Sequence, residues 1–406
     1  MGIGNIANTG MRAAMANMET ISNNIANANT IGFKRSNVNF SDIYPSASGT
    51  SGTQIGLGVN VGSISQDFST SGFVLTNSGL DLSISKNGFF ITKDAIGGQV
   101  SYTRAGQFST SPDGYIISKY SGNRLQGYAA SNGVIPQGGG ITDLHFNNSS
   151  LPAKASTLIS TNINLDANST VPANPFDPSD TSSFNFQSKS FLYDSLGNKH
   201  DVISYYSKTA NNNWDTHVYI DNNFVGTSGS PTGSIAFNSD GSIASVTGLN
   251  NLSFSSTNGA DYPQTFSFDF EGSTQVATNS IVNSSESDGY EPGQFSGLSI
   301  DNNGMVWMQY SNSQKFLAGQ VALANFKAPQ GLTDIGNMSW VASSDSGAAL
   351  LNQSGSVGNI RSNSLEQSNV DLTSEMVSLI NAQHTFQANA QVEQTYSEVM
   401  STVIKI

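Results

Sequence analysis

Small and apolar residues recur along residues 1–28 at alternating intervals of four and three positions. This spacing is that of a heptad seam and predicts an amphipathic helix. Gly10 weakens the helix, and the Asn- and Gly-containing run 27–32 ends it. The residues on the seam are Ala7, Met11, Ala14, Met18, Ile21, Ile25 and Ala28.

A second helix is expected at the other end of the chain. A capping signal at Ser368 and Asp371 opens it, and no Pro or Gly interrupts it as far as Ile406. Its apolar positions repeat in two phases, separated by a stammer after Phe386. The first phase contains Leu372, Met376, Leu379 and Phe386, and the second contains Val392, Tyr396, Val399, Val403 and Ile406.

Two long amphipathic helices at the chain ends admit two interpretations. Each helix could pack on the globular core of its own chain. Alternatively, because a lone chain cannot bury all sides of both helices, neighbouring subunits would cover the remaining apolar surface. The second interpretation is favoured because only β-type sequence lies between the two helices.

The middle of the chain has the pattern of β-strands. Turn signals such as Asn87-Gly88, Asp113-Gly114, Gly197-Asn198 and Asp240-Gly241 recur along it. Alternating or aromatic-rich runs lie between them, at 89–92, 114–117, 202–206, 266–270 and 304–308. These runs predict short antiparallel strands, so the fold class is mainly β with α-helical termini.

Shifts in composition suggest nested β domains. Two loop-rich stretches, 147–180 and 271–297, bracket a β segment that reads as a domain inserted into another. The expected divisions are a terminal helical domain (1–35 and 365–406), an extended connector (36–70), a shell β domain (71–150 and 285–364) and an inserted outer β domain (151–284).

Composition and charge exclude several classes of protein. The chain has 406 residues with 16 Lys and Arg against 29 Asp and Glu, a net charge of −13, which argues against nucleic-acid binding. It has no cysteine, so disulfides and cysteine-bound zinc are excluded. No apolar run approaches the roughly 18 residues that span a bilayer. The first residues lack the pattern of a cleaved signal peptide, so export would need another route.

No motif with catalytic or ligand-binding spacing is apparent. The four histidines, His145, His200, His217 and His384, are not spaced as metal ligands. The glycine-rich run 56–62 lacks the spacing of a phosphate-binding loop, and no nucleophile elbow occurs. We therefore expect no catalytic residue, no cofactor and no metal site.

Two long motifs at opposite ends of the chain resemble the signatures of the bacterial flagellar rod and hook protein family. The first spans 22–35 and the second spans 365–376, continuing through 382–391. Further similarity occurs at 102–108 and 323–326. The signature residues are Asn23, Asn24, Ile25, Ala26, Asn27, Thr30, Gly32, Phe33 and Lys34 in the first motif, and Ser368, Asn369, Val370, Asp371 and Leu372 in the second.

The resemblance implies a structural, non-enzymatic subunit that polymerises with itself into a hollow tube on the outside of the cell. The terminal helices would form a coaxial inner layer around an export channel, and the seam residues named above would drive assembly. It also implies partners: the distal rod protein, the hook–filament junction protein, the hook cap protein and the flagellar type III export apparatus. Neither nucleic-acid binding nor membrane insertion is implied.

The inserted segment 151–284 distinguishes hook members of this family from rod members. Rod members are shorter and lack so large an insertion, so its presence favours a hook member, whose tube is curved and flexible. Two alternatives remain: a straight, rigid rod-type protein, and a secreted β-rich adhesin or enzyme. The adhesin alternative accounts for the Ser, Asn and Thr content but not for the paired terminal heptads.

Overall fold

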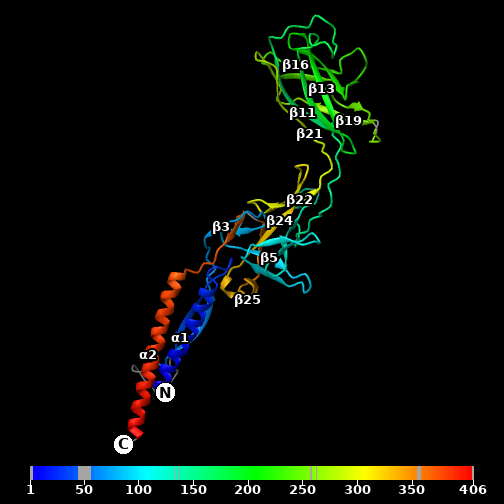
Figure 1. Ribbon diagram of the computed structural model, residues 1–406. Coiled ribbons are helices and arrows are strands. Elements are labelled where there is room, and N and C mark those ends of the chain that lie inside the picture. The colour runs from blue at the N-terminus through cyan, green and yellow to red at the C-terminus, as the bar shows by residue number, and fades with distance from the viewer. Residues whose placement is uncertain are drawn as a thin grey trace. The chain divides into compact units, whose positions relative to one another are not determined.

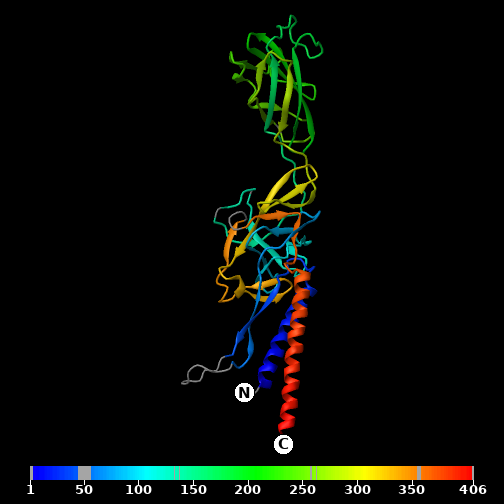
Figure 2. The same ribbon diagram turned by 90° about the vertical axis from the view of Figure 1, so that its left-hand side faces the viewer.

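The computed structural model describes residues 3–43, 56–131, 133–136, 138–256, 258–261, 263–353 and 358–404. The chain divides into two compact units (Figures 1 and 2). The first comprises residues 1–148, 297–309 and 315–406, and the second comprises residues 149–296 and 310–314. The segment 151–284, expected as an insertion, falls within the second unit.

The first unit contains both long helices and a β domain. The helices are α1 (Ile3–Ala26) and α2 (Leu372–Ile404). Its strands before the second unit are β1 (Ser36–Asp42), β2 (Val59–Gln66), β3 (Phe73–Leu75), β4 (Leu82–Ile84), β5 (Phe89–Lys93), β6 (Val100–Thr103), β7 (Phe108–Thr110), β8 (Ile116–Ser118), β9 (Arg124–Ala129) and β10 (Thr142–Asp143). Those after it are β22 (Phe295–Ile300), β23 (Met305–Tyr310), β24 (Lys315–Asn325), β25 (Thr333–Gly336), β26 (Ser339–Val341), β27 (Leu350–Gln353), β28 (Ile360–Ser362) and β29 (Ser364–Glu366), with a 3₁₀ turn at Pro329–Gly331.

The β domain of the first unit is closed by strands from both ends of the chain. Its main sheet runs in the order β22-β23-β24-β9-β5-β6-β26-β25. β4 pairs with β28 and β3 pairs with β29, so early and late segments share hydrogen bonds. Phe89 lies in the core and packs edge-on against Phe326 and Trp340. This interleaving places both helix-bearing segments on one β domain.

The segment 36–70 differs from the extended connector that the sequence predicts. β1 and β2 form an antiparallel hairpin, with Ser36 opposite Gln66 and Asp42 opposite Val59. The hairpin contacts α1, and Gly58 allows the close approach because a Cβ there would overlap the Thr9 hydroxyl oxygen. Apolar and polar residues alternate only over 38–40 in β1 and 59–61 in β2, so the period-2 signal on which strand prediction depends is very short.

The second unit is a sandwich of two sheets around one core. Its strands are β11 (Leu158–Asp166), β12 (Phe186–Tyr193), β13 (Lys199–Ala210), β14 (Asn213–Ile220), β15 (Asn223–Val225), β16 (Gly233–Phe237), β17 (Ile243–Thr247), β18 (Leu252–Phe254), β19 (Gln264–Asp269), β20 (Thr274–Val276) and β21 (Ile281–Ser287). One sheet runs β18-β19-β11-β20 with β21 also on β11, and the other runs β12-β13-β14-β16-β17. Residues of both sheets share the core, including Ile163, Trp214 and Phe266.

The predicted strands and turns are present, with one difference in direction. The Gly197-Asn198 turn joins β12 to β13, and Gly197 has a φ of 84°, which glycine adopts without strain. β11, however, pairs in parallel with β19 and with β20, whereas the sequence pattern predicts antiparallel pairs. Strand direction depends on which distant segments meet, and periodicity does not report it.

The carboxylate of Asp288 binds the segment 154–158 within the second unit. Asp288 accepts hydrogen bonds from the backbone N–H groups of Thr157 (2.7 Å) and Leu158 (2.9 Å) and lies 3.0 Å from Lys154 Nζ. Burial alone would raise the pKa of Asp288, but these hydrogen bonds outweigh it and lower the pKa to about 2.

The Asp288→Asn variant should therefore lose acid-sensitive stability in the second unit. A carboxyl whose pKa is depressed in the folded state stabilises the fold above its unfolded pKa of about 4, and this stability is lost as the pH falls towards 2. We expect the variant to be about 1–2 kcal/mol less stable than the parent at pH 7 and equally stable near pH 2. Hydrogen exchange of β11 amides as a function of pH measures the difference. Glu286→Gln, at an exposed position on β21, is the control, and an equal effect of both changes would contradict the role of Asp288.

Candidate assembly surface and the junction that carries it

The two terminal helices pack side by side in an antiparallel pair (Figures 1 and 2). Gly4, near the start of α1, lies against Glu393 and Tyr396, whereas Asn24, near its end, lies 3.4 Å from Glu375. Midway, a Cβ on Gly10 would come within 2.7 Å of the Asn389 side chain. Gly10, which sequence reasoning identifies only as a weak point, thus permits close approach of the helices.

The seam that faces α1 is made of small and polar residues on α2. Glu375 and Ala382 are the buried residues of α2, and Asn389 and Tyr396 continue this line at the same interval. On α1 the seam includes Ala7, Ala14 and Ile21, which are buried as the heptad predicts. The half-buried members of the predicted α1 seam are Met11, Met18, Ile25 and Ala28.

The residues predicted to drive assembly on α2 are largely left uncovered. Leu379, Phe386 and Tyr396 are half-buried, and the exposed members are Leu372, Met376, Val392, Val399 and Val403. Ile406 lies outside the described residues. Four further apolar residues of α2, which sequence reasoning left out, are also exposed: Val377, Ile380, Met400 and Ile404.

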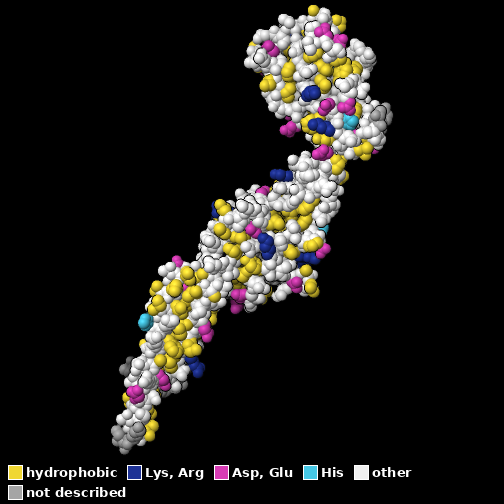
Figure 3. Space-filling model, in the orientation of Figure 1, with side chains coloured by type: hydrophobic (Ala, Val, Ile, Leu, Met, Phe, Trp, Pro, Cys, Tyr) yellow, Lys and Arg dark blue, Asp and Glu magenta, His cyan; other side chains and the backbone are white. Residues whose placement is uncertain are grey.

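This uncovered band is large for a surface helix. Met376 is 54% exposed and Ile380 is 51% exposed. Hydrophobic side chains run along the visible face of the helix pair (Figure 3). Single exposed apolar residues are common on proteins, but nine of them on one helix indicate an interaction surface. We refer to the nine exposed α2 residues, five predicted and four additional, as the α2 apolar band.

The two signature motifs converge where the helices join the β domain. The Asn24 side chain donates to the Ser36 carbonyl (2.8 Å) and accepts from the Ser36 N–H (2.9 Å), which links the end of α1 to β1. Asn369 makes the equivalent link before α2. Its side chain accepts from the Arg35 N–H and donates to the Asp67 carbonyl, both at 2.7 Å.

Other signature residues shape the chain locally. Thr30 donates to the Asn27 side chain and Asn27 donates to the Asn23 carbonyl, which closes the end of α1, while Ala26 is exposed. The N-terminal cap of α2 is Asp371, which accepts the Ser374 N–H at 2.8 Å. Ser368 lies before the helix instead, and its carbonyl accepts the Ser71 hydroxyl. Phe33 and Val370 are half-buried.

A buried ion cluster lies at the centre of this junction. The Glu366 carboxylate lies 2.8 Å from Lys34 Nζ and 3.0 Å from Arg104 Nη1, and the three side chains are at most 1% exposed. Burial lowers the pKa of both Lys34 and Arg104, although the attraction of Glu366 opposes this shift. Gly32 lies beside the cluster with a φ of 74°, and a Cβ there would come within 2.6 Å of the Ala105 nitrogen.

Sequence reasoning identified Lys34 as a signature residue but missed its partners as functional positions. The available signal was the rarity of charge, since only 11% of residues are charged. Arg104 and Glu366 both lie within motifs that resemble the family. Charged residues inside such motifs, in a chain this poor in charge, are candidates for a buried ion pair.

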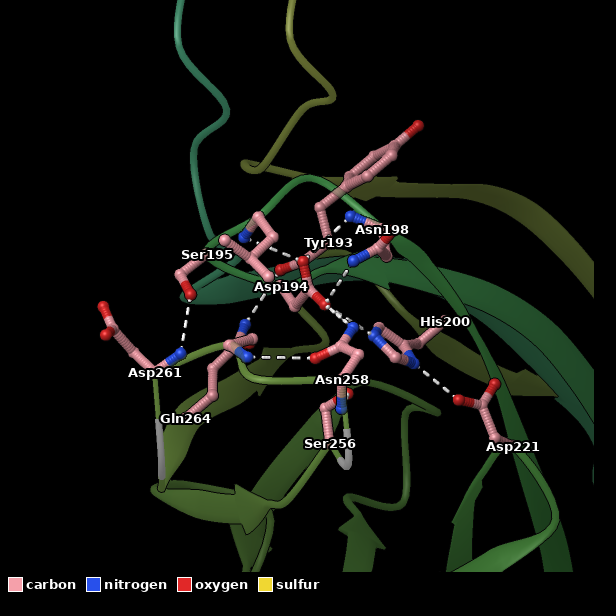
Figure 4. A network of polar contacts seen from close by, with 12 residues as sticks. Tyr193, Asp194, Ser195, Asn198, His200, Asp221, Ser256, Asn258, Asp261 and Gln264 are labelled. Atoms are coloured by element: carbon pink, nitrogen blue, oxygen red, sulfur yellow. Dashed lines mark hydrogen bonds and ion pairs between the residues drawn. The ribbon is translucent and has the colours of Figure 1, made fainter.

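A polar cluster in the second unit contains the residue types of a hydrolase (Figure 4). The two ring nitrogens of His200 face the carboxylates of Asp194 and Asp221, so neither faces a nucleophile. The Ser195 hydroxyl accepts the Asp261 N–H at 2.7 Å. Burial would raise the pKa of Asp194, but hydrogen bonds from Asn258, Asn198 and His200 hold it well below its usual range. The cluster therefore has a structural role, since it ties the β12–β13 turn to Asn258 and Asp261.

No group of three or more metal-ligating side chains occurs among the residues that the structure describes. The charged side chains described above pair with one another instead, although the buried Nε of Arg104 has no hydrogen-bond partner among the described residues. The absence of a cofactor remains a prediction.

Four family models match the chain in consecutive order. They are the flagella basal body rod protein (residues 5–34), the flagellar hook protein FlgE/F/G D1 domain (83–171), the flagellar basal body protein FlaE D2 domain (164–290) and the flagellar basal body rod FlgEFG protein C-terminal domain (361–406). The chain is 36% identical to the flagellar hook protein FlgE of Escherichia coli K12, and the match covers 98% of each chain. This chain belongs to the flagellar hook protein family.

Other relatives agree with this assignment. The hook protein FlgE of Salmonella typhimurium is 37% identical, and that of Borreliella burgdorferi is 30% identical, each over 98% of both chains. The crystal structure of Helicobacter pylori flagellar hook protein FlgE2 shares the fold, with a TM-score of 0.52 and 13% identity. The structural match covers 72% of this chain and 100% of the Helicobacter pylori chain.

The family determines the broad role of the hook subunit. The protein is a structural component of the flagellum and not an enzyme. It assembles with copies of itself and has partners in the flagellar basal body. The rod-type and adhesin alternatives are both disfavoured, because the relatives that match over the full length are named as hook proteins. Within the described part of the chain, no helix has the length and apolar character needed to cross a membrane.

Proposed function

We propose that the subunit polymerises into a hollow, curved and flexible tube that links the rod to the filament and transmits motor torque as a universal joint. In this tube α1 and α2 form the inner layer around the export channel. The observation that carries the proposal is the α2 apolar band, which α1 leaves uncovered. A surface of this kind favours burial against further subunits at about 25 cal/mol per Å² of apolar area.

The domain assignments follow from this arrangement. Residues 1–35 and 365–406 would form the inner layer, residues 71–150 and 285–364 the shell, and residues 151–284 the outermost domain. The junction around Glu366 would carry torque between the inner layer and the shell, because it holds both helix ends on the β domain. A heterologous contact repeated by a rotation that does not close would then give an open helical polymer.

The proposed partners are those of a hook at its two ends. The distal rod protein would contact the first subunits, the junction protein the last, and the cap protein would cover the growing end. Export would proceed through the flagellar type III apparatus without a cleaved signal peptide, which would place the polymer outside the cell.

Complementation tests the proposed function. The chain should restore hooks and swimming to a bacterium whose own hook gene has been deleted. The purified protein should form curved tubes in electron micrographs. Mass spectrometry of the exported protein should show an unprocessed N-terminus. Straight rods, or no polymer under any condition, would contradict the proposal.

Removal of the second unit should preserve tubes and abolish their curvature. Leu151 and Gly293 exchange two backbone hydrogen bonds, of 2.7 and 3.0 Å, so a short link can replace the chain between them. The inner layer and its apolar band remain in this variant. Bending changes the spacing of subunits most at large radius, where we place the removed domain. We expect straight tubes and poor swimming, and deletion tubes as curved as the parent's would refute this role.

A further inference from the structure

A groove lies between the helix pair and the β1–β2 hairpin, all within the first unit. It has a volume of about 660 Å³. Its walls include Ala13 and Ala14 of α1, Ala382 and Thr385 of α2, and Phe40 of β1. Phe40 is 48% exposed, so the groove has a large apolar rim as well as a floor of small side chains.

The C-terminal end of α2 extends beyond its partner helix (Figures 1 and 2). Tyr396 already lies opposite Gly4, near the described start of α1, and α2 continues to Ile404. This overhang, residues 399–404, contains four exposed apolar side chains: Val399, Met400, Val403 and Ile404. Val403 is 61% exposed and Ile404 is 78% exposed.

We infer that the groove of one subunit receives the α2 overhang of a second copy of this chain. The inference rests on the proposed function, because it names the partner for one part of the assembly surface. The groove offers an apolar recess without an occupant from its own described residues, and the overhang offers apolar side chains that its own α1 does not cover.

Charge and geometry both suit this pairing. Neither the residues lining the groove nor residues 399–404 include a charged side chain, so the contact buries no unpaired charge. The middle of the groove lies near residue 384 of α2, some 17 positions before the middle of the overhang. At 1.5 Å per residue, a copy that lies beside the groove and is displaced along the helix axis by about 26 Å brings its overhang level with the groove.

The contact is head-to-tail, because two different surfaces meet. After one contact forms, one subunit still has a free overhang and the other still has a free groove, so the contact propagates along the polymer. It therefore specifies an axial neighbour, which a general apolar band on α2 does not.

Disulfide cross-linking tests the pairing in the assembled full-length protein. The chain has no cysteine, so Thr385→Cys and Val403→Cys introduce the only thiols. On one helix these positions are about 27 Å apart, far beyond the roughly 7 Å limit between bridged Cα atoms, so a disulfide must join two subunits. Oxidation of the polymer should give a ladder of covalent oligomers on a non-reducing gel.

The control combines Val403→Cys with His384→Cys, an exposed position next to Thr385 that does not line the groove. We expect no ladder from this pair. If polymers form but the Thr385 pair gives no ladder, or both pairs give equal ladders, the inference fails while the proposed function stands. If the double variant does not polymerise, co-assembly of the two single variants replaces it, and covalent dimers are then required. Failure of the parent chain to polymerise counts against the proposed function instead.

Discussion

Subunits in which Leu379 or Phe386 is replaced by Asp should remain monomeric while their β domains stay folded. Both side chains are half-buried on α2, beside the apolar band. In a polymer each would be covered on all sides, and burying an unpaired carboxylate costs several kcal/mol. Every subunit carries the change, so the penalty is repeated at each addition and elongation should stop.

A third variant separates failure of assembly from failure of folding. Met376 is 54% exposed in the single chain, so Met376→Asp leaves the monomer intact and affects only contacts with other copies. Sedimentation should show monomers for all three variants, and far-UV circular dichroism should retain the β signal of the parent.

The matched control is Phe386→Leu, which keeps an apolar side chain and should polymerise. Tubes of normal appearance from Met376→Asp and Phe386→Asp would remove the α2 apolar band from the assembly surface. Loss of the β signal in Phe386→Asp alone would instead assign this side chain to the fold of the monomer.

Replacement of Glu366 by Gln should destabilise the first unit by about 3–5 kcal/mol, because it leaves two buried cations without an anion. Lys34 and Arg104 both pair with this carboxylate, and the three side chains are almost completely buried. The backbone N–H of Ser71 also donates to the same carboxylate at 3.2 Å, so the substitution disturbs the chain on both sides of the junction.

Denaturant unfolding, monitored by the hydrogen exchange of β29 amides, measures this loss of stability, since β29 carries Glu366. Lys119→Gln is the control, because it removes one partner of the Lys119–Asp81 pair, whose lysine side chain is 45% exposed. Pairs of this kind contribute about 0–1 kcal/mol. A loss below about 1 kcal/mol in Glu366→Gln would contradict the role of the cluster.

A triple variant distinguishes charge from packing at the junction. Replacing Lys34 and Arg104 by Met together with Glu366 by Leu removes all three charges and keeps apolar volume. Buried ion clusters are often replaced in this way without net loss. We expect the triple variant to recover much of the stability that Glu366→Gln loses.

Local signals predicted the class of each segment. The 4-3 spacing of residues 7–28 and the uninterrupted run after Asp371 correctly predicted α1 and α2, because helix period and capping depend on neighbours within one or two turns. Turn dipeptides and aromatic runs likewise predicted strands such as β5 and β13. The end motifs then indicated the family, which the full-length relatives confirm.

Local signals did not predict which face of α2 packs against α1. Periodicity favours the largest apolar residues, such as Leu372 and Met376, as the packed face. In the structure α1 meets α2 along smaller and polar residues, including Ala382 and Asn389, because Gly4 and Gly10 allow close approach. The large residues are thus left for other contacts, and their role in assembly remains a prediction.

The sequence by itself therefore determined two terminal helices, a β-rich middle and a family. Only the tertiary structure decided the antiparallel helix pair, the parallel pairing of β11 and the cluster that joins Lys34 to Glu366 across 332 positions of sequence. Hydrogen bonds within a helix or turn connect residues close in the chain, so their signals are local. Which segment covers which face, and which buried cation finds its carboxylate, depends on contacts between residues that no short window contains.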